Sequence, residues 1–265
     1  MKNTATDQTA YSDTHSAALA LGIRPGITAV IGGGGKTTLL KLLADELTCH
    51  KDGIQKRTPK VILCTSTHIL PFRDYPCIET SPDTDTDSAA RKQAETAARI
   101  SDAFQDSPVI CVGTPEKSEE MGLIKYIAPA VPFARLAKLA DYVLVEADGS
   151  RNRPFKAHAG HEPVIPENAG RVIYVAGAFG FMQPVRDAVH RPELFIRQMH
   201  VDPDSVLTPE LAAAHICREN LADVCCLFCP SEESEGRAPH PEMPDLIARF
   251  ERSLSIPLVK LNMPW

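Results

Sequence analysis

Short apolar runs alternate along this chain with longer segments in which apolar residues recur every three or four positions. The short runs are rich in Val, Ile and Leu and are bounded by Gly, Pro or polar residues, as is typical of buried strands. They predict strands at 27–31, 61–64, 108–113, 142–146, 171–175, 223–229 and 257–261. The amphipathic segments predict helices at 16–21, 36–47, 89–104, 131–140, 192–199 and 243–253, and one more that begins at the Thr208-Pro209 cap.

The alternation of strands and helices predicts the fold class. Parallel strands need crossover connections, which helices supply, so we expect an α/β fold whose mainly parallel sheet is covered by helices on both faces. No internal repeat or domain boundary interrupts the pattern, and residues 16–265 are expected to form one domain. Residues 1–15 are polar and poor in large apolar groups, which predicts a flexible N-terminal tail. The acidic segment 71–88 is expected to be a solvated loop, and 117–128 an excursion or a small hairpin.

The first predicted strand leads into a helix through a turn that consists of Gly32, Gly33, Gly34 and Gly35. Glycines permit positive φ and let backbone N–H groups approach an anion, and the N-terminus of the following helix adds its own unpaired N–H groups. The turn therefore predicts a phosphate-binding loop. In this loop Lys36 reaches the outer phosphates of a nucleotide, Thr37 binds Mg²⁺ through its hydroxyl, and Thr38 completes the cradle.

The spacing of this loop departs from the commonest phosphate-loop pattern, G-x-x-x-x-G-K-[ST]. Val30 stands where that pattern has its first glycine. The chain instead matches a shortened loop, similar to that of the Mur ligase and folylpolyglutamate synthetase group. A glycine-rich turn without a ligand is the alternative. The order of strand, glycines, Lys-Thr-Thr and leucine-rich helix favours nucleotide binding in a fold like that of the P-loop NTPases.

Two acidic residues follow the strand predicted at 142–146. Glu146 ends that strand and Asp148 comes two positions later, so both are candidates to bind Mg²⁺ together with Thr37. One acid is expected to hold the metal while the other orients an attacking group, and the sequence leaves open which does which. Asp148-Gly149 is also a turn signal. The binding role is favoured because an apolar strand that ends in Glu146 would otherwise bury an unpaired charge.

Cationic and imidazole side chains are further candidates for the site. A polar segment directly after the acids supplies Arg151 and Arg153, and His190 and Arg191 precede a Pro-initiated helix. Arginine offers paired donors to phosphate or carboxylate groups, so these residues are candidate catalytic groups that stabilise transition-state charge. A solvated surface is the competing interpretation.

Thr67 and His68 follow the strand predicted at 61–64. Ligands of open parallel sheets bind at the carboxyl ends of the strands. Thr67 is therefore a candidate for contact with Mg²⁺ or the γ-phosphate, and His68 for an acid, base or sensor. A turn or helix cap explains the same residues without any function.

Composition excludes several other functions. The chain has 265 residues, a net charge of −6 and no basic block, which argues against nucleic acid as a partner. No apolar run approaches the roughly 20 residues that span a bilayer, so no membrane contact is expected and the protein is expected to be cytoplasmic. The eight cysteines fall mostly in apolar strands and are expected to be reduced. Core packing is favoured over metal binding for Cys226 and Cys229, which lack a second pair.

With these residues in view, the chain resembles the YqeC-type family of accessory proteins for selenium-dependent molybdenum hydroxylases, also described as selenium cofactor biosynthesis proteins. The resemblance covers most of the chain and lies in GGGGKTT at 32–38, TSTH at 65–68, VLVEADGSRNRPFKAH at 143–158, HEPVIP at 161–166 and VHRPEL at 189–194. It implies a nucleotide-dependent helper in the maturation of such a hydroxylase, with the hydroxylase or its cofactor as a partner.

The residues after the strand at 223–229 predict the base of the nucleotide. Many nucleotide switches have an Asn-Lys-x-Asp motif there that reads guanine, and members of the resembled family tend to have an Asn. This chain has Pro230-Ser231-Glu232-Glu233. ATP is therefore preferred to GTP.

These features together predict a function in three versions. The first is a Mg²⁺-dependent enzyme that hydrolyses a nucleoside triphosphate or transfers its phosphoryl group. The second is a nucleotide-gated chaperone that delivers a cofactor without significant turnover of its own. The third is an ATP-dependent amide ligase, suggested by the short loop.

Overall fold

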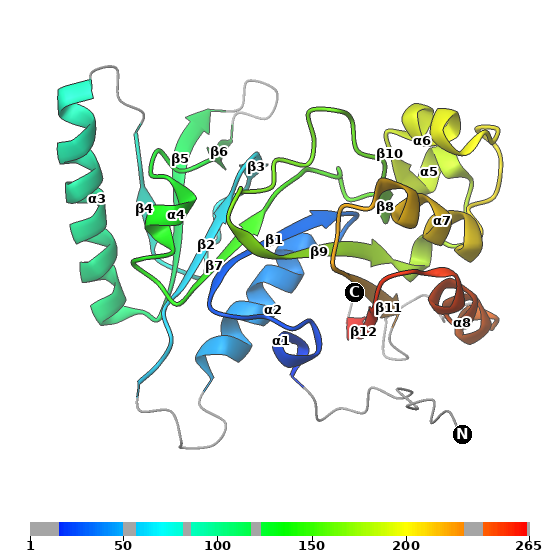
Figure 1. Cartoon of the computed structure of the whole chain (residues 1–265), viewed down its shortest axis with the longest axis horizontal. Helices are drawn as coiled ribbons and strands as arrows, with labels where there is room; N and C mark the ends of the chain where they lie inside the picture. The colour runs from blue at the N-terminus through cyan, green and yellow to red at the C-terminus, as the bar shows by residue number, and fades with distance from the viewer. Residues whose placement is uncertain (1–15, 50–56, 82–85, 118–122, 231–240, 264–265) are drawn as a thin grey trace, which may run out of the picture.

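A computed structural model describes residues 16–49, 57–81, 86–117, 123–230 and 241–263. Within this part of the chain, ten strands form the main sheet (Figure 1). Its strands follow one another in the order β12 (Leu258–Met263), β11 (Val224–Pro230), β9 (Ala169–Gly177), β1 (Gly26–Gly32), β7 (Tyr142–Glu146), β2 (Val61–Thr65), β5 (Val109–Lys117), β6 (Ile124–Ile127) and β3 (His68–Ile69), with β4 (Cys77–Glu79) paired to β5.

The pairing is parallel except where β6 meets β5 and β3. A second, two-stranded sheet pairs β8 (Phe155–Lys156) with β10 (Val189–His190) in parallel. The helices are α1 (Ala17–Ala20), α2 (Lys36–Thr48), α3 (Thr86–Asp106), α4 (Phe133–Leu136), α5 (Val185–Ala188), α6 (Pro192–Met199), α7 (Pro209–Glu219) and α8 (Met243–Ser253), with a 3-10 turn η1 (Ala178–Gly180).

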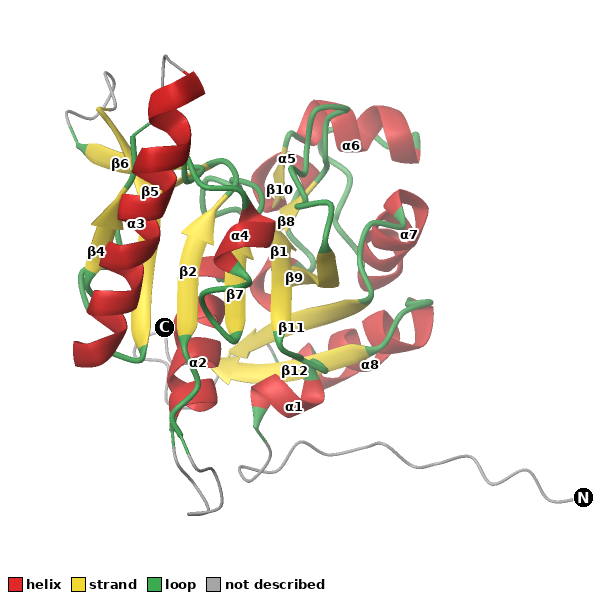
Figure 2. Cartoon of the chain, turned by 60° about the vertical axis from the view of Figure 1, so that its left-hand side comes forward, coloured by secondary structure: helices red, strands yellow, loops and turns green. Residues whose placement is uncertain are grey.

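Successive residues of the central strands point to opposite faces of the sheet, and each face is covered by helices (Figure 2). On one face, Leu144 of β7 packs in a core with Leu39 and Leu43 of α2. On the other, Val143 belongs to a core that contains Ile100 of α3. Because both faces are buried, the strands are almost continuously apolar, as in other parallel sheets. The predicted α/β class with a mainly parallel sheet is confirmed.

Several predicted boundaries change in the structure. The helix expected at 131–140 keeps only four residues, because the chain must turn after Leu136 to enter β7, and Asp141 N–H bonds to Lys60 O instead. The segment 71–88, expected to be a loop, contains β4 and the start of α3, so that prediction was wrong in part. Ile78 of β4 is buried, but three residues are too few to show an alternating pattern. Of the two options for 117–128, the structure has the hairpin, formed by β5 and β6.

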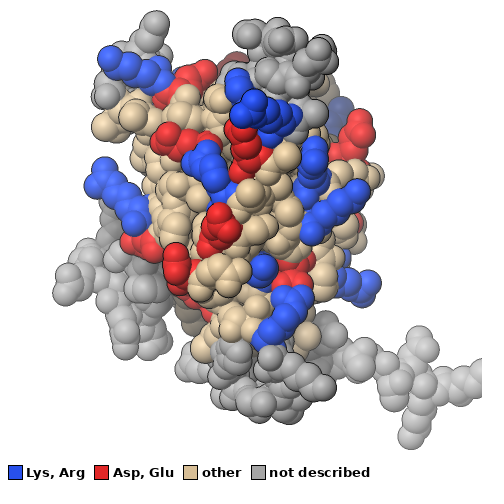
Figure 3. Space-filling model, turned by 90° about the vertical axis from the view of Figure 1, so that its left-hand side faces the viewer, with Lys and Arg blue, Asp and Glu red and all other residues tan. Residues whose placement is uncertain are grey.

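Other expectations concern the surface and the cysteines. All eight cysteines are free, and five of them are buried. None of the described helices has the length and apolar character needed to cross a membrane. On the face that carries α3, basic and acidic side chains of the described residues are interspersed (Figure 3). The predicted tail at 1–15 and the residues Ser231, Glu232 and Glu233 lie outside the described part of the chain.

Candidate functional site

The carboxyl ends of β1, β7 and β2 bring the predicted site residues to one edge of the sheet. Glu146 is in register with Val30 on one side and with Thr65 on the other. The glycine turn leaves β1 directly after Val30 and Ile31, and Thr67 follows Thr65. The predicted loop, the predicted acids and the predicted 65–68 segment therefore meet at this edge, as ligand-binding segments do in open parallel sheets.

The glycine turn is closely packed against the chain that follows β7. A Cβ atom added to Gly33 would lie 2.0 Å from Pro154 O, and one added to Gly35 would lie 2.4 Å from the ring of Phe228. Gly35 also has a φ of +99°, which other residues rarely adopt. Glycine is required here by close contacts as well as by backbone conformation.

Three N–H groups of the turn donate to acceptors of the chain itself. Gly32 donates to Asp148 Oδ2 at 2.8 Å, Gly33 to a β9 carbonyl at 2.7 Å, and Gly34 to Arg153 O at 2.6 Å. The first intrahelical bond of α2 comes later, from Leu39 N–H to the carbonyl of the last glycine. In this conformation an anion at the turn would meet the N–H groups of the first turn of α2, which have no intrahelical partner.

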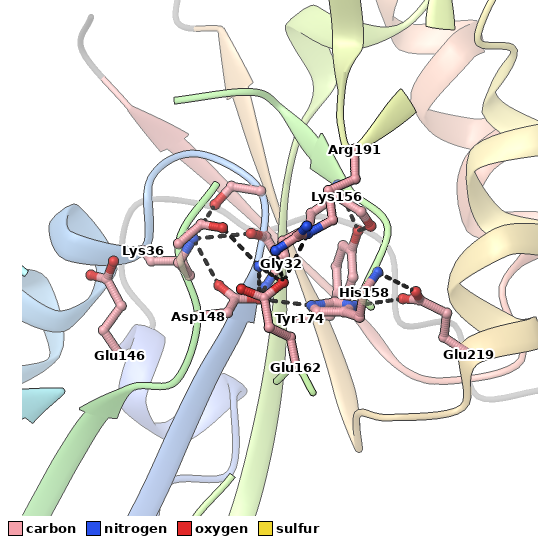
Figure 4. Close-up of polar contacts among 12 residues, drawn as sticks. Gly32, Lys36, Glu146, Asp148, Lys156, His158, Glu162, Tyr174, Arg191 and Glu219 are labelled. Atoms are coloured by element: carbon pink, nitrogen blue, oxygen red, sulfur yellow. Dashed lines mark hydrogen bonds and ion pairs between the residues drawn. The ribbon is translucent and has the colours of Figure 1, made fainter. Parts of the chain in front are cut away.

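Lys36 is turned back toward the loop instead of outward (Figure 4). Its Nζ donates to Gly32 O at 2.9 Å and to Gly33 O at 3.1 Å, and it lies 3.0 Å from Asp148 Oδ1. The Lys36 side chain is only 3% exposed. To reach a phosphate, the ammonium group would have to leave the two carbonyls.

The two candidate acids have different surroundings, and Figure 4 shows them on opposite sides of Lys36. Glu146 Oε2 accepts a hydrogen bond from Thr37 Oγ1 at 2.9 Å. Burial raises the pKa of Glu146, and the charge of Lys36 and the bond from Thr37 offset this only in part. This carboxylate therefore lacks a close cationic partner among the described residues.

Asp148, by contrast, is fully buried among donors and cations. Its Oδ2 contacts Gly32 N–H at 2.8 Å and His158 Nε2 at 2.7 Å, with Lys156 Nζ at 3.6 Å, while Oδ1 faces Lys36 without an aligned hydrogen bond. Burial alone would raise the pKa of Asp148, but Lys36, His158 and Lys156 outweigh it and hold that pKa well below its usual range. Through these contacts Asp148 holds the glycine turn and Lys36 in place.

His158, Lys156 and Glu219 are further important residues of the site, and the sequence analysis covered only the first two, as part of the polar segment after the acids. His158 Nδ1 lies 2.7 Å from Glu219 Oε2, so the imidazole is held between two carboxylates. Burial lowers the pKa of His158, but its bonds to Asp148 and Glu219 raise it overall. The cluster of His158 and Lys156 after the acids was a signal that the sequence offered. Glu219, which comes from α7, had no such signal.

Six of the predicted site residues line a cavity of about 620 Å³ at the same edge of the sheet. It is lined by Thr67, His68, Gly149, Arg151, Arg153, Glu162, Arg186, Val189, His190, Arg191, Pro192 and Glu193. Among the described residues, none of those at 32–38 lines it. The predicted site is thus divided into the loop with its acids and a separate cavity rich in arginine.

Several polar side chains of the cavity contact one another or its surroundings. Arg191 pairs with Glu162 at 3.0 Å, His68 pairs with Glu116 at 3.0 Å, and Arg153 donates to a backbone carbonyl. Burial and the charges of Lys156 and Arg191 lower the pKa of His190 to about 4, so this imidazole is neutral at pH 7. The described residues include no cluster of three or more His, Cys, Asp or Glu side chains that would hold a metal by itself.

Comparisons with known proteins identify relatives of the chain. A family model described as YqeC protein matches residues 28–193. The uncharacterized protein YqeC of Escherichia coli (strain K12) is 30% identical over 187 residues, which make up 69% of this chain and 64% of that relative. The match thus covers less than two thirds of the relative's length. No solved structure matches the chain.

Proposed function

The chain belongs to the YqeC family, and we propose that it binds a nucleoside triphosphate with Mg²⁺ at the N-terminus of α2 and hydrolyses it or transfers its phosphoryl group. The observation that supports this most directly is the hydrogen bond of 2.9 Å between Thr37 Oγ1 and Glu146 Oε2. A loop hydroxyl beside a carboxylate from the neighbouring strand is the pair that holds Mg²⁺ in phosphate-loop proteins.

The surroundings of Glu146 fit a divalent cation. The side chain is buried and its pKa is raised, so a charged carboxylate at this position is unfavourable without a cation beside it. Thr37 and Glu146 would hold Mg²⁺, which supplies charge neutralisation for the outer phosphates when bound. Asp148 is the less suitable ligand because cations and a backbone N–H already surround it.

The other residues have roles that follow from their contacts. Released from the loop carbonyls, Lys36 would neutralise charge on the transferred phosphoryl group, while Asp148 keeps the loop in place. Arg151, Arg153 and Arg191 are the candidate cations for the transition state. ATP remains the preferred nucleotide over GTP.

We infer the biological role from the family resemblance: nucleotide turnover assists the maturation of a selenium-dependent molybdenum hydroxylase. A nucleotide-gated chaperone is the second candidate, and one observation favours it. Lys36 is held by carbonyls of its own loop, and in the chaperone model a partner releases it. Phosphate release by the chain alone supports the enzyme, release only with the apo-hydroxylase supports the chaperone, and dependence on a carboxylic acid supports an amide ligase.

Calorimetry with neighbouring threonine variants tests the nucleotide assignment. The wild type is titrated with a non-hydrolysable ATP analogue in the presence and absence of Mg²⁺, together with Thr37→Val and the control Thr38→Val. The Thr38 side chain is exposed, and Thr38→Val keeps the backbone N–H that the cradle needs, so this variant should bind like the wild type. Thr37→Val should weaken Mg²⁺-dependent binding at least tenfold, which corresponds to about 1.4 kcal/mol. Equal Mg²⁺-dependent affinities of both variants for the analogue, or no binding by the wild type, would contradict the proposal.

A further inference from the structure

The arginine-rich cavity has more positive charge than its own lining neutralises. Four arginines line it against two glutamates, Glu162 and Glu193. Arg191 is paired with Glu162, and Arg186 is paired with Asp204, which lies outside the lining. Counted over the lining arginines and glutamates alone the formal charge is +2, and the pairing of Arg186 leaves Arg151 and Arg153 as the lining arginines without a carboxylate partner among the described residues.

Some polar groups of the cavity lack partners within the described part of the chain. Arg151 is exposed, with no ion pair to a described residue. The hydroxyl of Thr67 is buried and makes no hydrogen bond to any described group. Arg151 is therefore available to an anionic ligand, whereas the Thr67 hydroxyl is covered by the chain itself.

The cavity lies beside the proposed phosphate loop, and three of its arginines are the candidate cations named above for the transferred phosphoryl group. Thr67 and His68 follow β2, Gly149 and Arg151 follow β7, and Arg191 precedes α6, so three segments converge on it. The residues at 32–38 are not in its lining, although the chain after β7 contacts both regions. A ligand in the cavity would be a second molecule bound next to the nucleotide.

We propose that this cavity binds a small molecule with a dianionic phosphate group, as the second substrate of the protein. A volume of about 620 Å³ suits a small organic molecule. Arginine donors match phosphate oxygens, and Arg151 and Arg153, which have no carboxylate partner among the described residues, can together face a phosphate monoester, which carries about −1.5 to −2 charges at pH 7. The role as substrate rests on the proposed function, whereas the binding itself is measured without nucleotide.

Glycerol 3-phosphate is the probe for this proposal, and its binding to the full chain is followed by ³¹P NMR without nucleotide or Mg²⁺. Arg151→Gln should weaken binding at least fivefold. The matched control is Arg24→Gln, an exposed residue before the amino end of β1, and it should bind like the wild type. Thr37→Val should also bind like the wild type, which separates this site from the N-terminus of α2. Glycerol and acetate should not compete.

Three outcomes overturn the proposal. These are the absence of saturable binding, equal affinity for acetate, and loss of binding in Thr37→Val with retention in Arg151→Gln. The last outcome would place the probe at α2 and support the nucleotide site, while failure of nucleotide binding alone leaves the cavity result standing.

The titration of His190 gives an independent readout. A bound dianion favours the protonated imidazole, so the pKa of His190 should rise from about 4 when the probe is present. Probe binding that leaves the His190 titration unchanged would place the probe outside the cavity and contradict the proposal.

Discussion

The two acids at this edge of the sheet, Asp148 and Glu146, have different partners and therefore different expected roles. Asp148 is fully buried and joins the backbone of the loop at Gly32 to Lys36 and His158. Glu146 lies on the other side of Lys36 with only a hydroxyl as its close partner. We therefore propose a structural role for Asp148 and metal binding for Glu146.

Uncharged replacements of the two acids should separate these roles. Glu146→Gln should leave the free energy of unfolding nearly unchanged, because its burial disfavours the charged form, and it should abolish the effect of Mg²⁺ on nucleotide affinity. Asp148→Asn should lower the free energy of unfolding by about 3 kcal/mol, because it leaves buried cations without their carboxylate. Urea unfolding and calorimetry with and without EDTA measure both effects. A stable Asp148→Asn that has lost its metal response would reverse the assignment.

His158 predicts a pH dependence of stability. Its pKa is raised in the folded protein, so the stabilisation is fully present below the ordinary histidine pKa of about 6.5 and is lost as pH rises through the folded value. His158→Gln should lower the free energy of unfolding by about 3 kcal/mol near the acidic end of the experiment below, because it removes a buried charge partner. Because the pKa of Asp148 is lowered, its protonation changes stability only in strongly acidic solution and not near neutral pH.

Urea unfolding of the wild type and His158→Gln from about pH 6 to pH 9 measures the difference. The difference in unfolding free energy should shrink as pH rises. A difference that stays constant across the range would show that the imidazole is neutral between its two carboxylates.

At the scale of elements, the glycine turn is fixed by segments that come from far along the chain. Pro154, in the segment after β7, packs closely against Gly33, and Phe228 of β11 packs closely against Gly35. The sequence indicated a turn that glycines make possible, but it could not show which segments would cover it. Those contacts depend on the order of the strands, which local patterns do not encode.

Alanine at Gly35 should therefore destabilise the protein by about 2 kcal/mol or more, through positive φ and overlap with a buried ring. Phe228 is fully buried, so a shift of its ring would disturb the packing around it. Gly160→Ala is the control, since its added Cβ would meet nothing within 4 Å, and its effect should stay below about 0.5 kcal/mol. Thermal unfolding compares the two. Similar losses for both, or no loss for Gly35→Ala, would contradict this view of the loop.

At the scale of the whole molecule, the sequence predicted the seven longer parallel strands of the main sheet because they are strongly apolar, as strands buried on both faces are. It missed β3, β4, β8 and β10, which are two or three residues long, and it could not give the strand order. The candidate residues were predicted individually from motifs. Their division between a loop site and a cavity, and the link from His158 to Glu219, needed tertiary structure.

The central claim is that the N-terminus of α2 binds the outer phosphates, with Mg²⁺ on Thr37 and Glu146. The most direct measurement is a crystal structure of the full chain with Mg²⁺ and a non-hydrolysable ATP analogue. We predict the terminal phosphates against the N–H groups of Lys36 and Thr37, the Lys36 ammonium turned from Gly32 O toward them, and the metal on Glu146. An analogue bound elsewhere, with Lys36 still on its loop carbonyls or the metal on Asp148, would contradict the account.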